Sequence, residues 1–317
     1  MNSIAIVHPM SLLGKEVRER LEQRPDLCRE VRLLASDEQE VGTLTESGGS
    51  ATFVHRADAE GLAGVDLAIF CGDIAADRLA LAQLPPTIRA VVASHGAGVE
   101  DGLPAVAGLA GDPWLGHDRL VAPSSTALAA AELLAPLADH GLAAAAVTAL
   151  LPVAERNQAG LDALFEETRS VLNFAGPGRS GLFAAQIAFN LLPDRTAGEL
   201  AESQLASLLG QPPRVSVQAV RGGVFHAVAL SLLLRFDHAP AIAELRQSLT
   251  RHPGLRFAKD AAKLGPVAAA GEERILLGEL RAAPDGLWLW AALDQLVLGA
   301  QNVLRLAEGM LRGGRAS

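Results

Sequence analysis

Few residues of this chain could carry covalent chemistry: two cysteines, eight histidines and a pair of serines. Cys71 ends a predicted strand, and ligands of parallel sheets gather at the carboxyl ends of strands, so it is a candidate nucleophile; a buried, inert thiol is the more common state. Ser124 and Ser125 precede an Ala/Leu-rich helical stretch over 126–138, where a serine usually serves as the N-cap. The histidines show neither i, i+4 pairs nor carboxylates at ligand spacing, so no metal site is predicted.

The first strand-to-helix turn has the frame of a dinucleotide-binding site, but most of its glycines are missing. Residues 4–7 form a predicted buried strand and 14–23 a predicted amphipathic helix. The segment His8-Pro9-Met10-Ser11-Leu12-Leu13-Gly14 stands where G-x-x-G-x-x-G would let a pyrophosphate approach the backbone. Only Gly14 remains. Pro9 lacks a backbone N–H donor. The side chains of His8, Met10 and Leu12 occupy space that a phosphate would need.

The elements that must position these residues fall into two groups. In the first third, strands alternate with helices, which predicts a parallel, Rossmann-like sheet. Its strands are predicted over 31–36, 51–55, 65–70, 90–94 and 120–122, with a helix over 73–83. Beyond residue 142 the strands lengthen, which predicts an α+β domain with a mixed sheet, a type often used for dimerisation. Its strands are predicted over 143–151, 214–220, 224–236, 274–281 and 287–292, and helices over 158–172, 198–209 and 294–311.

Composition excludes several classes of partner. The net charge of −9, from 27 basic and 36 acidic residues, disfavours nucleic acids and anionic membranes. Three Trp, nine Phe and no Tyr leave little surface for stacking on bases. Two cysteines are too few for a disulfide framework, and no signal peptide is evident, so a cytoplasmic protein is expected.

Three motifs bear on the identity of the family. They are the Pro-Ser-Ser-Thr start of the helix at Pro123, the segment Gln186-Ile187-Ala188-Phe189-Asn190-Leu191-Leu192-Pro193, and Leu287-Trp288-Leu289-Trp290 leading into Asp294-Gln295-Leu296. The chain resembles the aspartate-semialdehyde dehydrogenase family over nearly its whole length, and most of all its Usg-type paralogues. The resemblance implies a degenerate NADP-binding domain over 1–125, a dimerisation and substrate-type domain over 126–293, and a last helix, 294–317, that returns to the first domain.

The family's catalytic positions transfer incompletely. Its Asn-Pro-Asn-Cys motif matches Ala122-Pro123-Ser124-Ser125, which places Ser125 at the position of the nucleophilic cysteine. A serine hydroxyl ionises far less readily than a thiol and needs an adjacent base. The family's acid/base histidine aligns with His226 only if two residues are deleted before it. His226 is therefore either a relic at an equivalent place or an exposed strand histidine.

The family's anion-binding residues are mostly absent as well. Its Asp-Asn-Leu-Arg-Lys-Gly-Ala-Ala motif matches residues 294–301, where Val297-Leu298 replace the Arg-Lys pair, and Glu199-Leu200 replace basic helix positions. Arg221 and Arg156 are possible substitutes, but solvated surface charges are the more common reading of such residues.

These losses predict a homodimeric, catalytically inactive family member that binds no cofactor and acts through its dimer or an unknown protein partner. The alternative is an active NAD(P)-dependent oxidoreductase on an aldehyde such as aspartate semialdehyde. Ser11, Gly14 and Ser36 would then contact NADP.

Overall fold

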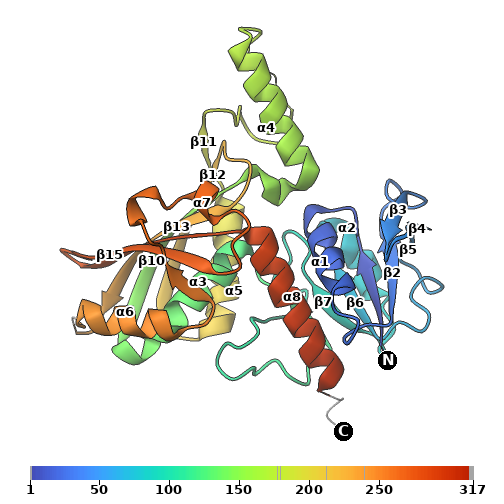
Figure 1. Cartoon of the computed structure of the whole chain (residues 1–317), viewed down its shortest axis with the longest axis horizontal. Helices are drawn as coiled ribbons and strands as arrows, with labels where there is room; N and C mark the ends of the chain where they lie inside the picture. The colour runs from blue at the N-terminus through green and yellow to red at the C-terminus, as the bar shows by residue number, and fades with distance from the viewer. Residues whose placement is uncertain (1, 177, 179, 212, 239, 314–317) are drawn as a thin grey trace. The chain divides into compact units, whose positions relative to one another are not determined.

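The computed structural model describes residues 2–176, 178, 180–211, 213–238 and 240–313 (Figure 1). The chain divides into two compact units: unit 1 is Met1–Ser124 with Gly299–Ser317, and unit 2 is Ser125–Leu298. Residues 314–317 of the predicted last segment lie outside the described residues. Within the described part of the chain, no helix combines the length and apolarity needed to cross a membrane.

Unit 1 is built on a seven-stranded parallel sheet in the order β5-β2-β1-β6-β7-β9-β8. The strands are β1 (Ser3–Val7), β2 (Glu30–Ala35), β5 (His55–Arg56), β6 (Leu67–Phe70), β7 (Arg89–Val92), β8 (Leu103–Pro104) and β9 (Arg119–Val121). Because β1 lies between β2 and β6, the strand order reverses beside β1. Ligands of open α/β sheets bind at such a switch point, outside the carboxyl ends of the strands.

Both faces of this sheet are covered, as the alternation of buried residues in β1 requires. Ile4 and Ile6 belong to a core cluster that includes residues of α1 (Leu12–Glu22) and the later part of α8 (Gln295–Arg312). The alternate residues Ala5 and Val7 belong to a second cluster, with residues of α2 (Ile74–Ala82). The predicted Rossmann-like parallel sheet is confirmed.

Unit 2 is built on a mixed sheet in the order β11-β12-β10-β13-β16-β15-β14. The strands are β10 (Leu142–Leu151), β11 (Leu191–Pro193), β12 (Arg214–Gly222), β13 (Val228–Phe236), β14 (Leu255–Phe257), β15 (Ile275–Ala283) and β16 (Gly286–Leu293). The central strand β10 runs parallel to β12 and antiparallel to β13, so the predicted mixed sheet is confirmed as well. The helices of unit 2 are α3 (Ser125–Leu134), α4 (Asn157–Leu172), α5 (Arg195–Leu209), α6 (Ile242–Arg251) and α7 (Pro266–Ala269), and α4 projects away from the sheet (Figure 1).

Several predicted elements need correction. The single strand expected over 224–236 begins only at Val228. Residues 223–227 are a loop, because Ala227 has a left-handed φ of 69° and the carbonyls of Val224 and Phe225 accept hydrogen bonds from Val153 and Ala154. The segment 37–50, in which no strand was predicted, contains β3 (Leu44–Ser47), which forms a hairpin with β4 (Ser50–Phe53). Helix α6 was not predicted.

Candidate functional site

The cofactor-type turn of unit 1 keeps the backbone of a glycine fingerprint without its glycines. His8, Ser11 and Gly14 occupy the three positions of G-x-x-G-x-x-G. His8 has φ 63°, a left-handed conformation that glycine adopts most easily. A Cβ on Gly14 would lie 2.3 Å from the His8 carbonyl oxygen, so this glycine lets α1 pack closely against the turn. Ser11 is the N-cap of α1, and its hydroxyl accepts a 2.9 Å hydrogen bond from the Gly14 amide. One first-turn donor of this helix is thus satisfied internally.

The side chain of His8 turns into the carboxyl edge of the sheet and is buried there, with 4% of the residue exposed. Its Nε2 lies 2.6 Å from the Ser36 hydroxyl and 3.2 Å from Asp77 Oδ1, and its Nδ1 lies 3.2 Å from Glu40 Oε2. Ser36 donates to Asp77 Oδ1 at 2.7 Å. A Cβ on Gly72 would lie 2.3 Å from Cδ2 of the ring, so the absence of a side chain at residue 72 gives the imidazole its space.

This arrangement makes His8 a cation among carboxylates. Burial alone would lower its pKa, but the hydrogen bonds and charges of Asp77 and Glu40 outweigh that effect and raise the pKa of His8 from 6.5 to about 10. Asp77 is fully buried and also accepts a 2.6 Å hydrogen bond from Ser94. Asp37 Oδ2 lies 3.6 Å from Nδ1 on the more exposed side. At neutral pH one imidazolium therefore faces three carboxylates.

The second cluster lies in unit 2 around Ser125, the first residue of α3. The Ser125 hydroxyl donates a short hydrogen bond to the carboxylate of Glu155, so it does not act simply as a helix cap, and the cap position is that of Ser124. Glu155 lies 3.5 Å from Arg221, which also binds Asp194 through Nη2 at 2.7 Å and Nε at 3.1 Å.

Arg221 is buried, with 4% of the residue exposed, and its Nη1 donates to the Pro152 carbonyl at 3.0 Å. The expectation of a solvated surface charge is therefore wrong for this residue. Each nitrogen of the guanidinium is already engaged by the chain itself. Two carboxylates surround this one cation, so an anionic ligand would have to displace Asp194 or Glu155 to reach it.

His226 lies in the loop between β12 and β13, not on a strand. Its Nε2 is 2.7 Å from Asp294 Oδ2, and its Nδ1 is 3.2 Å from the Gln295 amide nitrogen. Burial would raise the pKa of Asp294, but hydrogen bonds from His226 and from the Gly271 and Val297 amides lower it. Asp294 is thus a carboxylate that orients the His226 ring.

The structure also shows the environment of the other residues that the sequence suggested as candidates. Cys71 is buried, and burial raises the pKa of its thiol, which keeps it protonated and unreactive. Glu199 pairs with the exposed Arg195 on α5. Among the described residues, no group of His, Cys, Asp and Glu side chains is arranged to hold a metal. Sequence reasoning missed Glu40, Asp77, Glu155 and Asp194. Of these, only Asp194 carried a usable local signal, since it precedes a predicted helix and caps α5.

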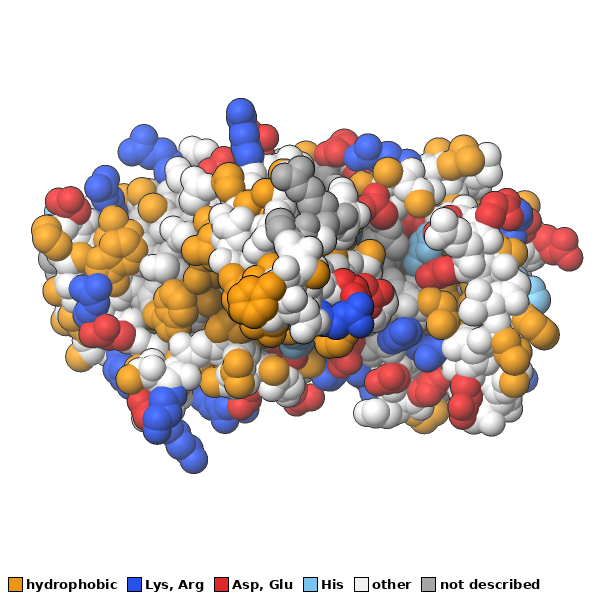
Figure 2. Space-filling model, turned by 90° about the horizontal axis from the view of Figure 1, so that it is seen from above, with side chains coloured by type: hydrophobic (Ala, Val, Ile, Leu, Met, Phe, Trp, Pro, Cys, Tyr) orange, Lys and Arg blue, Asp and Glu red, His pale blue; other side chains and the backbone are white. Residues whose placement is uncertain are grey.

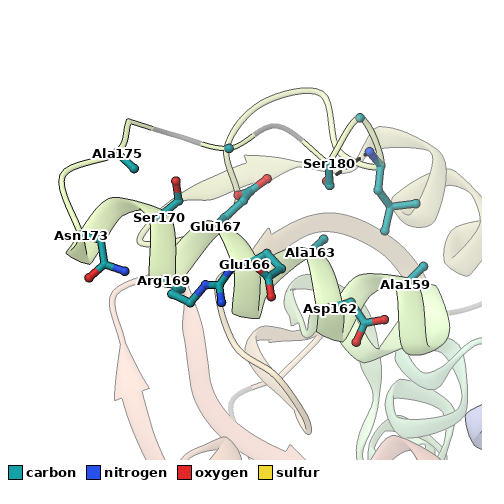
Figure 3. A pocket seen from close by; sticks show the side chains of 13 residues that line it. Ala159, Asp162, Ala163, Glu166, Glu167, Arg169, Ser170, Asn173, Ala175 and Ser180 are labelled. Carbon is teal, nitrogen blue, oxygen red and sulfur yellow. Dashed lines mark hydrogen bonds and ion pairs between the residues drawn. The ribbon is translucent and has the colours of Figure 1, made fainter.

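A hollow of about 890 Å³ lies beside α4, and its lining includes no residue of either cluster (Figure 3). Its described lining comes from α4 and from residues 173, 175, 178 and 180–182. The polar side chains that line it include Asp162, Glu166, Glu167, Ser170 and Asn173. Glu167 has a structural role, because it is 2% exposed and accepts hydrogen bonds from the Ile187 and Ala188 amides.

Comparisons with known proteins cover the whole chain. It is 29% identical over 336 residues to a USG-1 protein homolog of Azotobacter vinelandii, with 98% of each chain aligned. It is 25% identical over 338 residues to an aspartate-semialdehyde dehydrogenase of Prochlorococcus marinus, covering 98% of this chain and 96% of that protein. Among solved structures, a probable aspartate-semialdehyde dehydrogenase from Pseudomonas aeruginosa has the same fold, with a TM-score of 0.87, 23% identity and 98% of each chain covered. No protein-family model matches the chain.

Proposed function

The chain belongs to the aspartate-semialdehyde dehydrogenase family and has a Usg-type relative, and from this premise we propose that it has lost the dehydrogenase reaction. It acts instead through a homodimer or a protein partner. The alternative is an NAD(P)-dependent oxidoreductase that works on an aldehyde, such as aspartate semialdehyde, with an altered set of residues.

One observation carries this proposal: the buried His8 side chain and its carboxylate partners at the switch point of the unit 1 sheet. The family's NADP needs open space and anion-binding groups beside the β1–α1 turn. Here the imidazole packs against Gly72. Asp37 and Glu40 follow β2, and in dinucleotide-binding folds the residues after this strand bind the ribose of the cofactor. Carboxylates at that place repel a 2′-phosphate. The residues present therefore do not fit NADP.

The second cluster supports the same proposal. A thiolate chemistry that depends on a cysteine has no equivalent in Ser125, whose hydroxyl is hydrogen-bonded to Glu155. The Asp194 and Glu155 carboxylates engage Arg221, the cation best placed to hold an anionic substrate near them. His226 and Asp294 keep the form of an acid/base pair. A histidine–aspartate pair alone performs no oxidation.

The dimer is proposed from the sheet of unit 2. Along β10, buried residues such as Ala145, Val147 and Ala149 alternate with more exposed ones. The more exposed face includes Ala146, which is in register with Leu233 on β13, and Leu233 in turn with Trp288 on β16. A sheet face of small and apolar residues is suited to a second copy of the chain.

A further apolar surface is available to a partner on the projecting arm formed by α4 and the residues that follow it. Hydrophobic side chains gather over this part of the molecule in Figure 2. The arm exposes large side chains that a monomer would ordinarily bury. They are Phe165, Leu172, Phe174, Phe189 and Leu191, each more than half exposed.

Two measurements test the proposal. Calorimetry with NADP and with NAD should detect no binding at ligand concentrations that saturate an active family enzyme measured alongside. Phosphate-dependent oxidation of aspartate semialdehyde should also be absent. Micromolar NADP affinity with measurable turnover would establish the oxidoreductase alternative instead. Light scattering checks the assembly, since a monomer at micromolar concentration would contradict the homodimer.

A further inference from the structure

The cluster around His8 supports an inference that rests on the proposed loss of cofactor binding and goes further. We infer that the switch point of unit 1 has changed from an anion-binding to a cation-binding site, with the His8 imidazolium as its built-in ligand and Asp77 as its principal anchor. Once the His8 side chain is removed, the ligand class that fits this site is a small planar cation with N–H donors on opposite sides.

The groups around the His8 ring match the two N–H donors of a charged imidazole. A doubly protonated imidazole has two N–H groups. Nε2 lies at hydrogen-bond distance from the Ser36 hydroxyl and 3.2 Å from Asp77 Oδ1, and Nδ1 forms an ion pair with Glu40 Oε2 at 3.2 Å that lacks the alignment of a hydrogen bond. Ser36 donates onward to Asp77 Oδ1, and Ser94 donates to Asp77 Oδ2. A neutral imidazole would have to face one of these carboxylates with an unprotonated nitrogen. Both ring nitrogens therefore face carboxylates, which favours the charged ring.

The shape of the site depends on Gly72. The ring lies against residue 72, where a Cβ would be 2.3 Å from Cδ2 and 2.7 Å from Cγ of the imidazole. Gly72 has no positive φ, so its backbone does not by itself require glycine there. The imidazole ring fills the space above residue 72, so a side chain at residue 72 would exclude a ring from the site.

The bulk of His8 and the charge of Asp77 would each exclude a dinucleotide. If His8 were only a plug, removing its side chain would reopen an anion site. Asp77 is fully buried and comes from α2, not from the turn, so it stays when His8 is removed. An uncompensated buried carboxylate repels phosphate and attracts a cation. Charge and bulk therefore make opposite predictions for the same variant.

The experiment is chemical rescue of His8→Gly, a substitution that the left-handed φ at residue 8 tolerates. The unfolding midpoint should fall by roughly 5–10 °C, because buried carboxylates lose their cation. Imidazole near neutral pH should raise the midpoint of His8→Gly by several degrees and leave the wild type unchanged. Inorganic pyrophosphate and NADP should not raise it. His117→Gly, at an exposed loop histidine, is the matched control and should show neither loss nor rescue.

Two double variants separate charge from shape. In His8→Gly with Asp77→Asn the anchor is neutral, and in His8→Gly with Gly72→Ala the ring's space is filled; both should lose the imidazole effect. Stabilisation of His8→Gly by pyrophosphate or NADP would overturn the inference, as would the absence of any imidazole effect. If His8→Gly does not fold, ¹⁵N chemical shifts of the wild-type His8 ring at pH 8 decide, and a neutral ring would refute the cation site. NADP binding by the wild type would instead refute the proposed function.

Discussion

Unit 1 and unit 2 each contain a cluster of charged side chains at a helix start, and the two clusters differ in what surrounds the cation. In unit 1, the turn has the backbone of a glycine fingerprint, and a titratable cation, His8, sits between carboxylates. In unit 2, the cation is the guanidinium of Arg221, and one of its carboxylate partners also holds Ser125. Guanidinium groups in general remain protonated throughout the pH range in which proteins are studied. The unit 1 turn thus carries carboxylates where an anion-binding turn needs positive charge, whereas in unit 2 the donors of the cation are bound by the chain itself. Only the first of these arrangements depends on pH.

The largest effect should come from Arg221→Ala in unit 2. The substitution leaves Glu155 and Asp194 without their shared cation, and breaking a buried ion pair on one side costs about 3–5 kcal/mol. Denaturant unfolding monitored by circular dichroism measures the loss. The control is Arg195→Ala, which removes an exposed pair with Glu199 and should leave stability unchanged. Equal, small effects of both substitutions would show that Arg221 is not a structural centre.

The next effect should come from His8→Asn in unit 1, and it should depend on pH. Asparagine tolerates the left-handed backbone but carries no charge, so the loss below pH 6.5 should be about 2–3 kcal/mol. Folding raises the pKa of His8 from 6.5 to about 10, so its stabilisation is complete below pH 6.5 and disappears as the pH rises through 10.

Unfolding at pH 6, 8 and 10 provides the measurement for His8→Asn. The groups that face the ring are Asp37, Glu40 and Asp77, with the buried Cys71 nearby, and burial raises the pKa of Cys71 so that it stays neutral. The difference between wild type and variant should shrink across this range, whereas that for Arg221→Ala should not. A pH-independent difference for His8→Asn would remove the contrast between the two units.

A smaller loss of stability is expected for a substitution in the β1–α1 turn than for His8→Asn, and none for a similar substitution on α8. Gly14→Ala places a Cβ 2.3 Å from a backbone oxygen that cannot move aside easily, and such overpacking costs about 1–3 kcal/mol. Gly299→Ala on α8 is the matched control. Its Cβ would lie 3.5 Å from Leu13, an ordinary contact, and alanine favours a helix, so stability should be equal or slightly higher. Thermal unfolding of both variants tests this, and a neutral Gly14→Ala would mean that the turn is not tightly packed.

The sequence predicts the fold more completely than the clusters, for a physical reason. Periodicity reports which residues are buried, and this was enough for the parallel sheet of unit 1 and the mixed sheet of unit 2. It fails where hydrogen bonds override it, as at residues 224–227, which were predicted to begin a strand but form a loop. The clusters join residues far apart in the chain, such as His8 with Asp77 and Arg221 with Asp194. No local pattern marks such pairs, so Arg221 was misread as a surface charge.

The smallest effect concerns Ser125 and bears most directly on chemistry. Ser125→Ala removes one hydrogen bond to a carboxylate that Arg221 still holds, so the loss should be about 1 kcal/mol. Ser125→Cys restores the family's nucleophile at the start of α3. It should nevertheless give no phosphate-dependent aldehyde oxidation, because Glu155 lies against the new thiol and disfavours its thiolate, and His8 with its carboxylate partners still occupies the unit 1 switch point. The assay follows NADPH formation with aspartate semialdehyde and phosphate. NADPH formation by the unmodified protein, abolished by Ser125→Ala, would show that the cluster is a modified catalyst, and activity gained by Ser125→Cys alone would show that unit 1 still binds its cofactor.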